Sequence, residues 1–380
     1  MVPSRQRRHL FQCLDTICIF PDLSAMKNKI NFQRLVLKNW VLIFLLLLIC
    51  FFSILEPAFF SIRNVNNILI ASTAVLLLAA GETFVIISGG IDLSVGFIMG
   101  FSAVSSATVM QFLFAKGAGY PEPVCIIAGC LAGLLLGLIP GLVNGILVAR
   151  FRVPPFIATL GMYGIANGVA MKICGGFPVS FLPPLTGKIG NGYLAYYSSK
   201  SGLSLFQKPV LTDRADILAL VRLVPVSVII VAVLLIIFGL ILSKTRFGQH
   251  TYAIGGNVDA AIRSGIDVPR HLIRTYVISS FLASCAGVLL VLRFTMGNHT
   301  QFGATYELFA IASVVIGGAS LMGGKGTIYG TIIGVLLLGS LEIGFVMIGV
   351  EVFYRYIAVG CILIFAVLVD QVFPDLVHNE

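Results

Sequence analysis

The chain between Arg63 and Lys116 contains only two charged side chains, Glu82 and Asp92. Both lie near a glycine break that reads GETFVIISGGIDLSVG over residues 81–96. A carboxylate at the centre of a bilayer costs roughly 2.5–3.5 kcal/mol, so both side chains should face protein, water or a helix end. Irregular backbone at membrane depth is tolerated only where it is buried in protein or lines a cavity. The pattern predicts an interrupted membrane segment and favours transport over simple anchoring.

The composition extends this interpretation to the whole chain. Hydrophobic residues make up 58% of the 380 residues and charged residues 11%, whereas about 25% of an average soluble domain is charged. The sequence therefore predicts an all-α polytopic membrane protein. Spans of about 20 apolar residues can cross a bilayer. We expect about ten of them, at residues 40–55, 66–88, 92–114, 123–149, 155–174, 224–243, 272–292, 307–322, 328–348 and 353–369.

The net charge of +9 could indicate a nucleic-acid partner in a soluble chain. Here the basic residues lie mainly in the N-terminal tail and in loops beside apolar spans, so a topological signal explains them better and no nucleic acid is expected. We expect a cytoplasmic N-terminal tail at 1–39, a transmembrane domain at 40–370 and a cytoplasmic C-terminal tail at 371–380. A cytoplasmic loop at 244–271 and a periplasmic loop at 175–223 complete this topology.

Two smaller expectations concern where translation starts and whether the cysteines and histidines bind a metal. Met26 opens a compact cationic flank to the first span, so one hypothesis is that translation begins there and residues 1–25 are not translated. The eight cysteines show no C-x-x-C spacing, and the five histidines lie in tails and loops. We expect neither a metal site nor a disulfide framework.

Glycine recurs at every fourth residue of one predicted helix, at Gly129, Gly133, Gly137, Gly141 and Gly145. Such a stripe lets a neighbouring helix approach closely. Packing within one subunit is the simpler explanation, and a subunit interface is the alternative. Asn144 beside the stripe could bond a neighbouring helix or line a pathway. Thr159 and Asn167 are further polar candidates for the pathway.

The loop after the sixth span predicts a short capped helix. Asn257 suits the N-cap, Asp259 lies in the first turn where the helix dipole favours an anion, and Gly265 suits the left-handed C-terminal position. Arg263 follows Asp259 by four residues. Such a helix is not needed to join two spans. It is either a plain surface loop or a docking element moved by a cytoplasmic partner, in which alanines at 260 and 261 would fit closely into a groove.

Four segments resemble the permease subunit of ribose-type ATP-binding-cassette sugar importers. They read GETFVIISGGIDLSVG, GLVNGILVARFRVPPFIATLGM, RFGQHTYAIGGNVDAAIRSGI and ELFAIASVVIGGASLMGGKGT. The resemblance covers about residues 60 to 370, while 1–25 and 195–222 look unlike the family. It implies a type II importer fold of ten helices and a bacterial inner-membrane location. The implied partners are a second permease subunit in a homo- or heterodimer, cytoplasmic ATPase subunits, a periplasmic sugar-binding protein and membrane lipids.

The resemblance also implies roles for individual residues. The helix at 257–265 is similar to the coupling helix that sits in a cleft of the ATPase, and the segment 90–96 matches the family's break between the second and third helices. The expected coupling residues are Gly255, Gly256, Asn257, Asp259, Ala260, Ala261, Arg263 and Gly265. The expected residues of the break and pathway are Glu82, Gly89, Gly90, Asp92, Ser94, Gly96, Asn144, Thr159 and Asn167. No catalytic residue and no cofactor are expected in this chain, because ATP and Mg²⁺ would be bound by the partner ATPase.

Two sequence features allow other interpretations. The segment from Gly318 to Thr327 resembles a phosphate-cradling loop, but its register fails by an inserted glycine and no strand precedes it, so a tight turn is expected. An ion-coupled secondary transporter could use Glu82, Asp92, Glu307 or Glu342, since intramembrane acids often carry protons or cations. The capped cytoplasmic helix disfavours that alternative.

Overall fold

The computed structural model describes residues 40–115, 120–198, 202–206, 219–299 and 305–351, with isolated positions between 208 and 216 and between 353 and 368. The two predicted tails and the hypothesis about Met26 lie outside the described residues. Most of the span predicted at 353–369 also lies outside them. The count of ten spans is therefore not tested in full.

Helices dominate the described part of the chain. Seven of them are long and apolar enough to cross a membrane, judged by length and composition alone, and α3 and α14 are shorter apolar helices. Their bounds are α3 Trp40–Leu55, η1 Pro57–Phe60, α4 Ile62–Ile87, α5 Val95–Ala115, α6 Glu122–Ala149, α7 Pro155–Cys174, α8 Leu185–Gly190, α10 Val226–Lys244, α11 Arg246–Gly256, α12 Val258–Arg263, α13 Val268–Phe294, α14 Tyr306–Ile316 and α15 Ile328–Met347.

The spans predicted on either side of the glycine break, at 66–88 and 92–114, correspond to α4 and α5, and the break does not interrupt a single span. α4 alone has 26 residues and thus extends about 39 Å, beyond the ~30 Å hydrocarbon core. The break joins two complete helices, α4 and α5. The span predicted at 307–322 ends early at Ile316, because Gly317 and Gly318 leave the helix and Gly318 adopts a φ of 90°.

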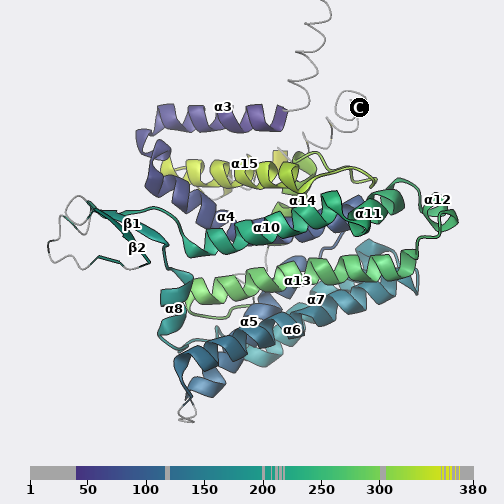
Figure 1. Cartoon of the computed structure of the whole chain (residues 1–380), viewed down its shortest axis with the longest axis horizontal. Helices are drawn as coiled ribbons and strands as arrows, with labels where there is room; N and C mark the ends of the chain where they lie inside the picture. Colours follow the sequence, from purple (N-terminus) through teal and green to yellow (C-terminus); the bar gives the residue numbers. More distant parts are fainter. Residues whose placement is uncertain are drawn as a thin grey trace, which may run out of the picture.

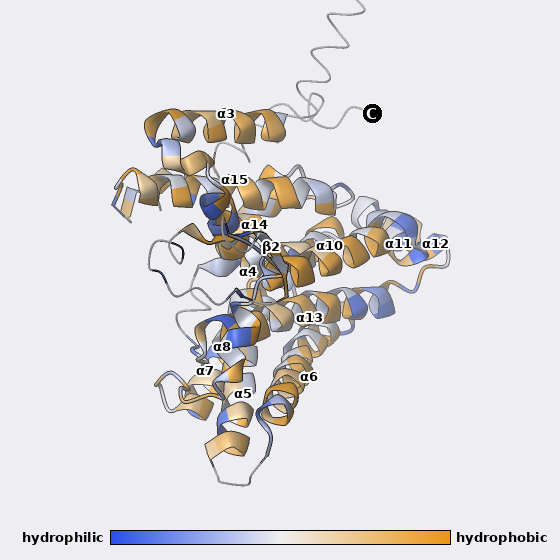
Figure 2. Ribbon diagram, turned by 60° about the vertical axis from the view of Figure 1, so that its left-hand side comes forward, coloured by the Kyte–Doolittle hydropathy of each residue, from blue (hydrophilic) through white to orange (hydrophobic). Residues whose placement is uncertain are grey.

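The helices lie side by side around α4 (Figure 1). It is the most buried of the seven candidate spans and contacts α10, α13, α14 and α15. On the other side of α13 lie α5 and α6. Apolar side chains cover much of the outside, among them Leu135 on α6, Ile157 on α7 and Ile236 on α10, which are all more than half exposed. This distribution suits a surface in contact with lipid, while hydrophilic residues gather at α11 and α12 (Figure 2).

A small antiparallel sheet breaks the all-α pattern in the loop predicted at 175–223. Its strands are β1 Ala195–Ser198, β2 Gly202–Leu205 and β3 Val221–Arg222, in the order β2-β1-β3. Asn66 on α4 anchors the sheet by donating to the carbonyl oxygen of Arg222 at 2.6 Å. The sheet lies at the end of the molecule opposite α12 (Figure 1). It falls on the 195–222 stretch that looks unlike the family.

Candidate functional site

A buried hydrogen-bond network holds the glycine break in place. The backbone N–H of Asp92 donates to Glu82 Oε1 at 2.9 Å. Asp92 Oδ1 accepts from the Ser94 N–H at 3.0 Å and from the Ser94 hydroxyl at 2.5 Å, and Asp92 Oδ2 accepts from the Ser279 hydroxyl at 3.1 Å. Asn144 Nδ2 donates to Ser94 Oγ at 2.9 Å. The network thus ties α4, α5, α6 and α13 together at one point.

Helix α7 joins the same point, but one predicted pathway residue on it does not. The Thr159 hydroxyl on α7 donates to the carbonyl oxygens of Ile91, at 3.2 Å, and Pro155, at 2.9 Å. Asn167 lies elsewhere on α7, where its Oδ1 is 3.0 Å from His299 Nδ1. The structure therefore gathers four predicted polar residues around Asp92 and leaves Asn167 apart.

Glycine lets neighbouring side chains close over the break. A Cβ at Gly90 would lie 2.7 Å from the Tyr276 hydroxyl, and Gly89 has a φ of 86°, which favours glycine. Gly96 is buried within the first turn of α5. Three buried polar atoms here have no hydrogen-bond partner among the described residues, namely Tyr276 OH, Glu82 Oε2 and Asn144 Oδ1.

The predicted capped helix is α12. Asn257 Oδ1 accepts from the Ala260 N–H at 2.9 Å, and Gly265, with a φ of 81°, follows the end of the helix. Asp259, Ala260 and Arg263 are exposed. These positions present one charged face at the end of the molecule.

The prediction that Ala261 fits into a groove of a partner is wrong. The alanine side chain is buried and packs against Ile254 and Val268, so it faces the chain itself and does not offer an outward contact. The exposed apolar side chains of α12 are instead Val258 and Ile262, at 47% and 56% exposure. They are four residues apart and so lie on one face of the helix.

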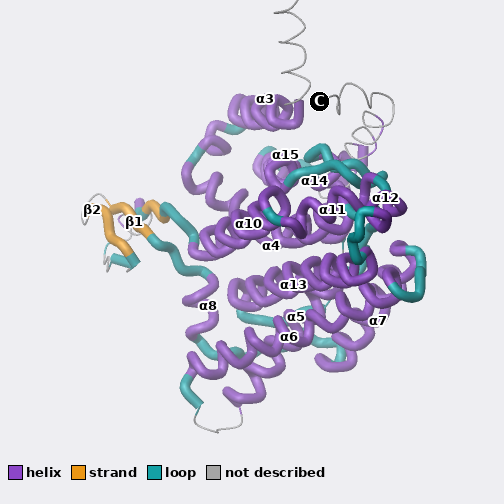
Figure 3. Tube along the Cα trace, turned by 45° about the vertical axis from the view of Figure 1, so that its right-hand side comes forward, coloured by secondary structure: helices purple, strands orange, loops and turns teal. Residues whose placement is uncertain are grey.

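Three glycine-rich segments meet beside the break. The N–H of Gly324 donates to the Ile87 carbonyl oxygen, at the end of α4, at 2.8 Å. A Cβ at Gly255 would collide with that same oxygen, and a Cβ at Gly323 would lie 2.9 Å from Gly255 O and 3.1 Å from Gly89 Cα. We call Ile87, Gly89, Gly255, Gly323 and Gly324 the glycine junction. It places the α14–α15 loop and the end of α11 directly against the break. Figure 3 shows the α14–α15 loop passing beside α11 and α12.

A tyrosine reinforces this junction. The Tyr252 hydroxyl of α11 donates to the carbonyl oxygen of Gly326 at 2.7 Å. Burial raises the pKa of Tyr252, so the hydroxyl remains a donor at neutral pH. The 318–327 segment that resembles a phosphate-cradling loop is thus the connection between α14 and α15, held against α4 and α11.

The glycine stripe of α6 lies against α5 and α13 of the same chain. A Cβ at Gly137 would collide with Ser284 Oγ, and one at Gly145 would lie 2.7 Å from Ile273 Cα. The other three glycines of the stripe make similar close approaches. The stripe is therefore filled within the chain by neighbouring helices.

Sequence reasoning missed two groups of residues at the site. Ser279 and Tyr276 lie on α13, and the only signal for them is a polar cluster inside an apolar span. Gly323 and Gly324 lie in the segment that resembles a phosphate-cradling loop, and no local pattern there indicates that they are neighbours of Gly255. Of the other acids, Glu307 is buried in the first turn of α14 and Glu342 is exposed on α15. The described residues contain no group of three or more His, Cys, Asp or Glu that could hold a metal ion.

Comparison with known proteins identifies the family. Residues 64–367 match the family described as the permease component of branched-chain amino acid transport systems. The chain belongs to this permease family. The permease is 37% identical to the ribose import permease protein of Bacillus subtilis over 350 residues, covering 92% of this chain and 98% of the relative. No solved structure matches the permease.

Two further relatives point the same way. The xylose transport system permease protein of Haemophilus influenzae is 37% identical over 366 residues, with 87% of this chain and 95% of the relative covered. The ribose import permease protein of Escherichia coli K12 is 36% identical over 358 residues, with 90% and 98% covered. The resemblance predicted from the four segments is confirmed, and the permease is a transport component whose relatives span nearly its whole length.

Proposed function

We propose that this permease is the membrane-spanning subunit of an ATP-binding-cassette importer that moves a small sugar across the bacterial inner membrane. The observation that carries the proposal is the glycine junction, in which the end of α11 lies directly against the end of α4. An exposed, capped helix is thereby connected to the break through one closely packed contact. The ribose and xylose permeases among the relatives support a monosaccharide as the substrate.

The mechanism follows from this connection. ATP-driven closure of two cytoplasmic ATPase subunits would displace α12, whose exposed face carries Asp259, Arg263 and Ile262. Because α11 is joined directly to α12 and packs on Ile87, the displacement reaches the end of α4. The Asp92 network then transmits it to α5, α6 and α13. The permease alternates between two packings whose populations its partners bias by differential binding.

Separate partners would supply the energy and deliver the sugar. ATP and Mg²⁺ would be bound by the ATPase, and a periplasmic binding protein would deliver the sugar at the end of the molecule that carries the sheet. Both termini would then lie in the cytoplasm, in agreement with the basic residues of the tail.

A second permease subunit, identical or related, would complete the pathway. On α7, a Cβ at Gly161, Gly164 or Gly168 would meet no atom within 4 Å. Glycines with open space on a membrane helix allow another helix to approach closely. The surface of α7 is therefore the part of the chain that we propose for this contact.

A charge reversal on α12 tests the coupling. In vesicles that also contain the ATPase and the binding protein, Arg263→Glu should lower sugar-stimulated ATP hydrolysis and uptake about tenfold, since an interface arginine is often worth 1–2 kcal/mol or more. Membrane insertion and thermal stability should be unchanged. Arg263→Lys, which keeps the positive charge at the same position, is the matched control and should retain most of the activity. Normal uptake and hydrolysis in Arg263→Glu would count against docking through α12.

A further inference from the structure

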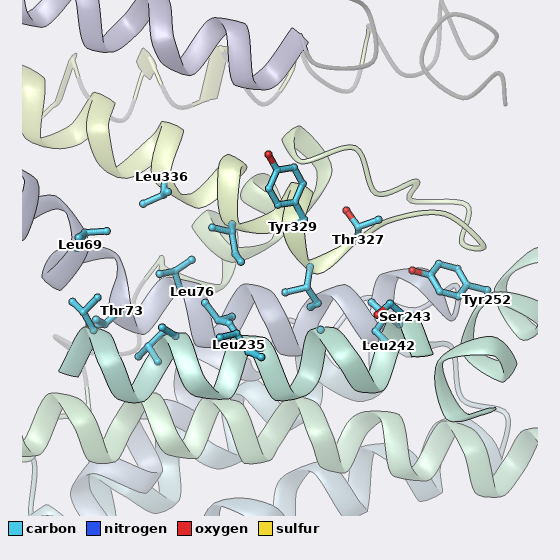
Figure 4. A pocket seen from close by; sticks show the side chains of 17 residues that line it. Leu69, Thr73, Leu76, Leu235, Leu242, Ser243, Tyr252, Thr327, Tyr329 and Leu336 are labelled. Atoms are coloured by element: carbon cyan, nitrogen blue, oxygen red, sulfur yellow. The ribbon is translucent and has the colours of Figure 1, made fainter. Parts of the chain in front are cut away.

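A groove of about 570 Å³ lies between α10 and α15, over the surface of α4 (Figure 4). Its walls are formed mostly by apolar side chains from these three helices, and Tyr252 of α11 closes one end. Leu69 and Leu76 contribute from α4, Leu235 and Leu242 from α10, and Leu336 from α15. The groove lies within the part of the molecule that would face hydrocarbon.

The polar groups of the walls are largely bonded to backbone already. The Thr73 hydroxyl donates to the Ile70 carbonyl oxygen at 2.7 Å, and the Tyr252 hydroxyl donates to Gly326. Thr327 Oγ1 accepts from the Gly330 N–H at 3.0 Å. A sugar placed here would lose hydrogen bonds to water without replacing them, which is costly. The walls therefore suit a hydrocarbon chain and not a transported sugar.

The length and opening of the groove also suit an acyl chain. Along α10 its lining runs from Val228 to Ser243, which is about 22 Å of helix. One leaflet of a bilayer contributes half of the ~30 Å hydrocarbon core, so one acyl chain fits along the groove in full. Ile236 and Tyr329 on its rim are 62% and 65% exposed, so the groove opens to the outside of the bundle.

Positive charge surrounds one end of the groove. Lys244 follows the lining residue Ser243, Lys325 precedes the lining residue Thr327 by two positions, and Arg246 begins α11; all three cations are exposed. No acidic residue occurs in 226–258 or in 317–341. Basic clusters between membrane helices at the cytoplasmic side attract anionic lipid headgroups.

We propose that this groove binds one acyl chain of an anionic phospholipid, with the headgroup phosphate beside Lys244, Arg246 and Lys325. Ala358 of the last predicted span packs in a different cluster, with Phe52 and Leu341. The lipid fills the space between α10 and α15 and so holds them at a fixed separation beside the glycine junction.

Native mass spectrometry of the full-length permease tests this site. The protein is extracted from vesicles of equal phosphatidylglycerol and phosphatidylethanolamine, and bound lipids are counted per chain. The wild type should retain phosphatidylglycerol in preference to phosphatidylethanolamine. Gly239→Phe should lose one phospholipid per chain, because a Cβ there points toward Ile328 at 3.8 Å and the ring would occupy the groove. Leu240→Phe is the matched control, since this neighbouring side chain is 54% exposed and outside the lining.

A second variant tests the headgroup without filling the groove. Replacing Lys244, Arg246 and Lys325 together by glutamine should lower the preference for phosphatidylglycerol about 100-fold, at roughly fivefold per cation. Equal lipid counts in wild type and Gly239→Phe would overturn the proposal, as would an unchanged lipid preference in the triple variant. A change in the number of chains per particle in Gly239→Phe would also overturn it, because the occupant would then be a second copy of the permease.

Discussion

At the scale of single residues, the central fact is how the Asp92 carboxylate is stabilised inside an apolar bundle. Its two oxygens accept three hydrogen bonds, two from Ser94 and one from Ser279. A buried carboxyl oxygen without a hydrogen-bond partner would be costly, and these bonds satisfy both oxygens. The hydroxyl of Ser94 takes part in two hydrogen bonds, because it donates to Asp92 and accepts from Asn144. The network therefore depends most on this one small side chain.

The loss of stability caused by a serine-to-alanine substitution should follow the number of hydrogen bonds that the serine makes. Ser94→Ala removes a donor to Asp92 and the acceptor for Asn144, and should destabilise the permease by about 2–4 kcal/mol, against about 1–2 kcal/mol for Ser279→Ala. Ser105→Ala should be neutral, since the buried Ser105 hydroxyl has no partner among the described residues. Thermal unfolding in detergent measures all three. Equal melting temperatures for Ser94→Ala and Ser105→Ala would show that the network does not support the fold.

At the scale of elements, the important feature is that α4, α11 and the α14–α15 loop approach each other through backbone. Such contacts are possible only where side chains are missing, because a Cβ at Gly255, Gly323 or Gly324 would lie 3.0 Å or less from a backbone atom of another segment. Packed backbone transmits displacement better than flexible side chains, because interiors at crystal-like density are hard to compress. The junction is thus suited to pass the motion of α12 to α4.

Substitutions at two adjacent glycines test whether the junction contact matters, or only the presence of glycine in the helix. Gly255→Ala places a Cβ against the Ile87 carbonyl oxygen, whereas a Cβ at Gly256 meets nothing within 4 Å. Gly255→Ala should lower stimulated ATP hydrolysis and uptake at least tenfold or lower the folded yield, since overpacking costs about 1–3 kcal/mol. Gly256→Ala should be neutral or slightly stabilising. If both variants transport like the wild type, α4 and α11 do not move as a unit.

At the scale of the whole molecule, the two ends differ. One end carries the exposed, charged α12 and the other a small antiparallel sheet, with the apolar bundle between them (Figure 1). Of the acids that an ion-coupled transporter could use, Glu82 and Asp92 share the buried network, whereas Glu307 lies on α14 and Glu342 on α15. The proposed function makes transport depend on energy from a separate ATPase.

Transport by purified components tests this dependence. Vesicles that contain the permease alone should not accumulate ribose or xylose, with or without a proton gradient. Addition of the ATPase, the binding protein and ATP should produce accumulation. Accumulation by the permease alone under a gradient would instead favour the ion-coupled mechanism.

The sequence by itself determined the features that depend on neighbours in the chain. The apolar spans, the N-cap at Asn257 and the left-handed Gly265 follow from local composition and backbone preference, and the four family segments predicted the family. Only the tertiary structure decided that Ser279 pairs with Asp92, that Ala261 points inward and that Gly255 meets Ile87 and Gly323. Those contacts join residues far apart in the chain, and they depend on how the helices pack around α4, which no local pattern specifies.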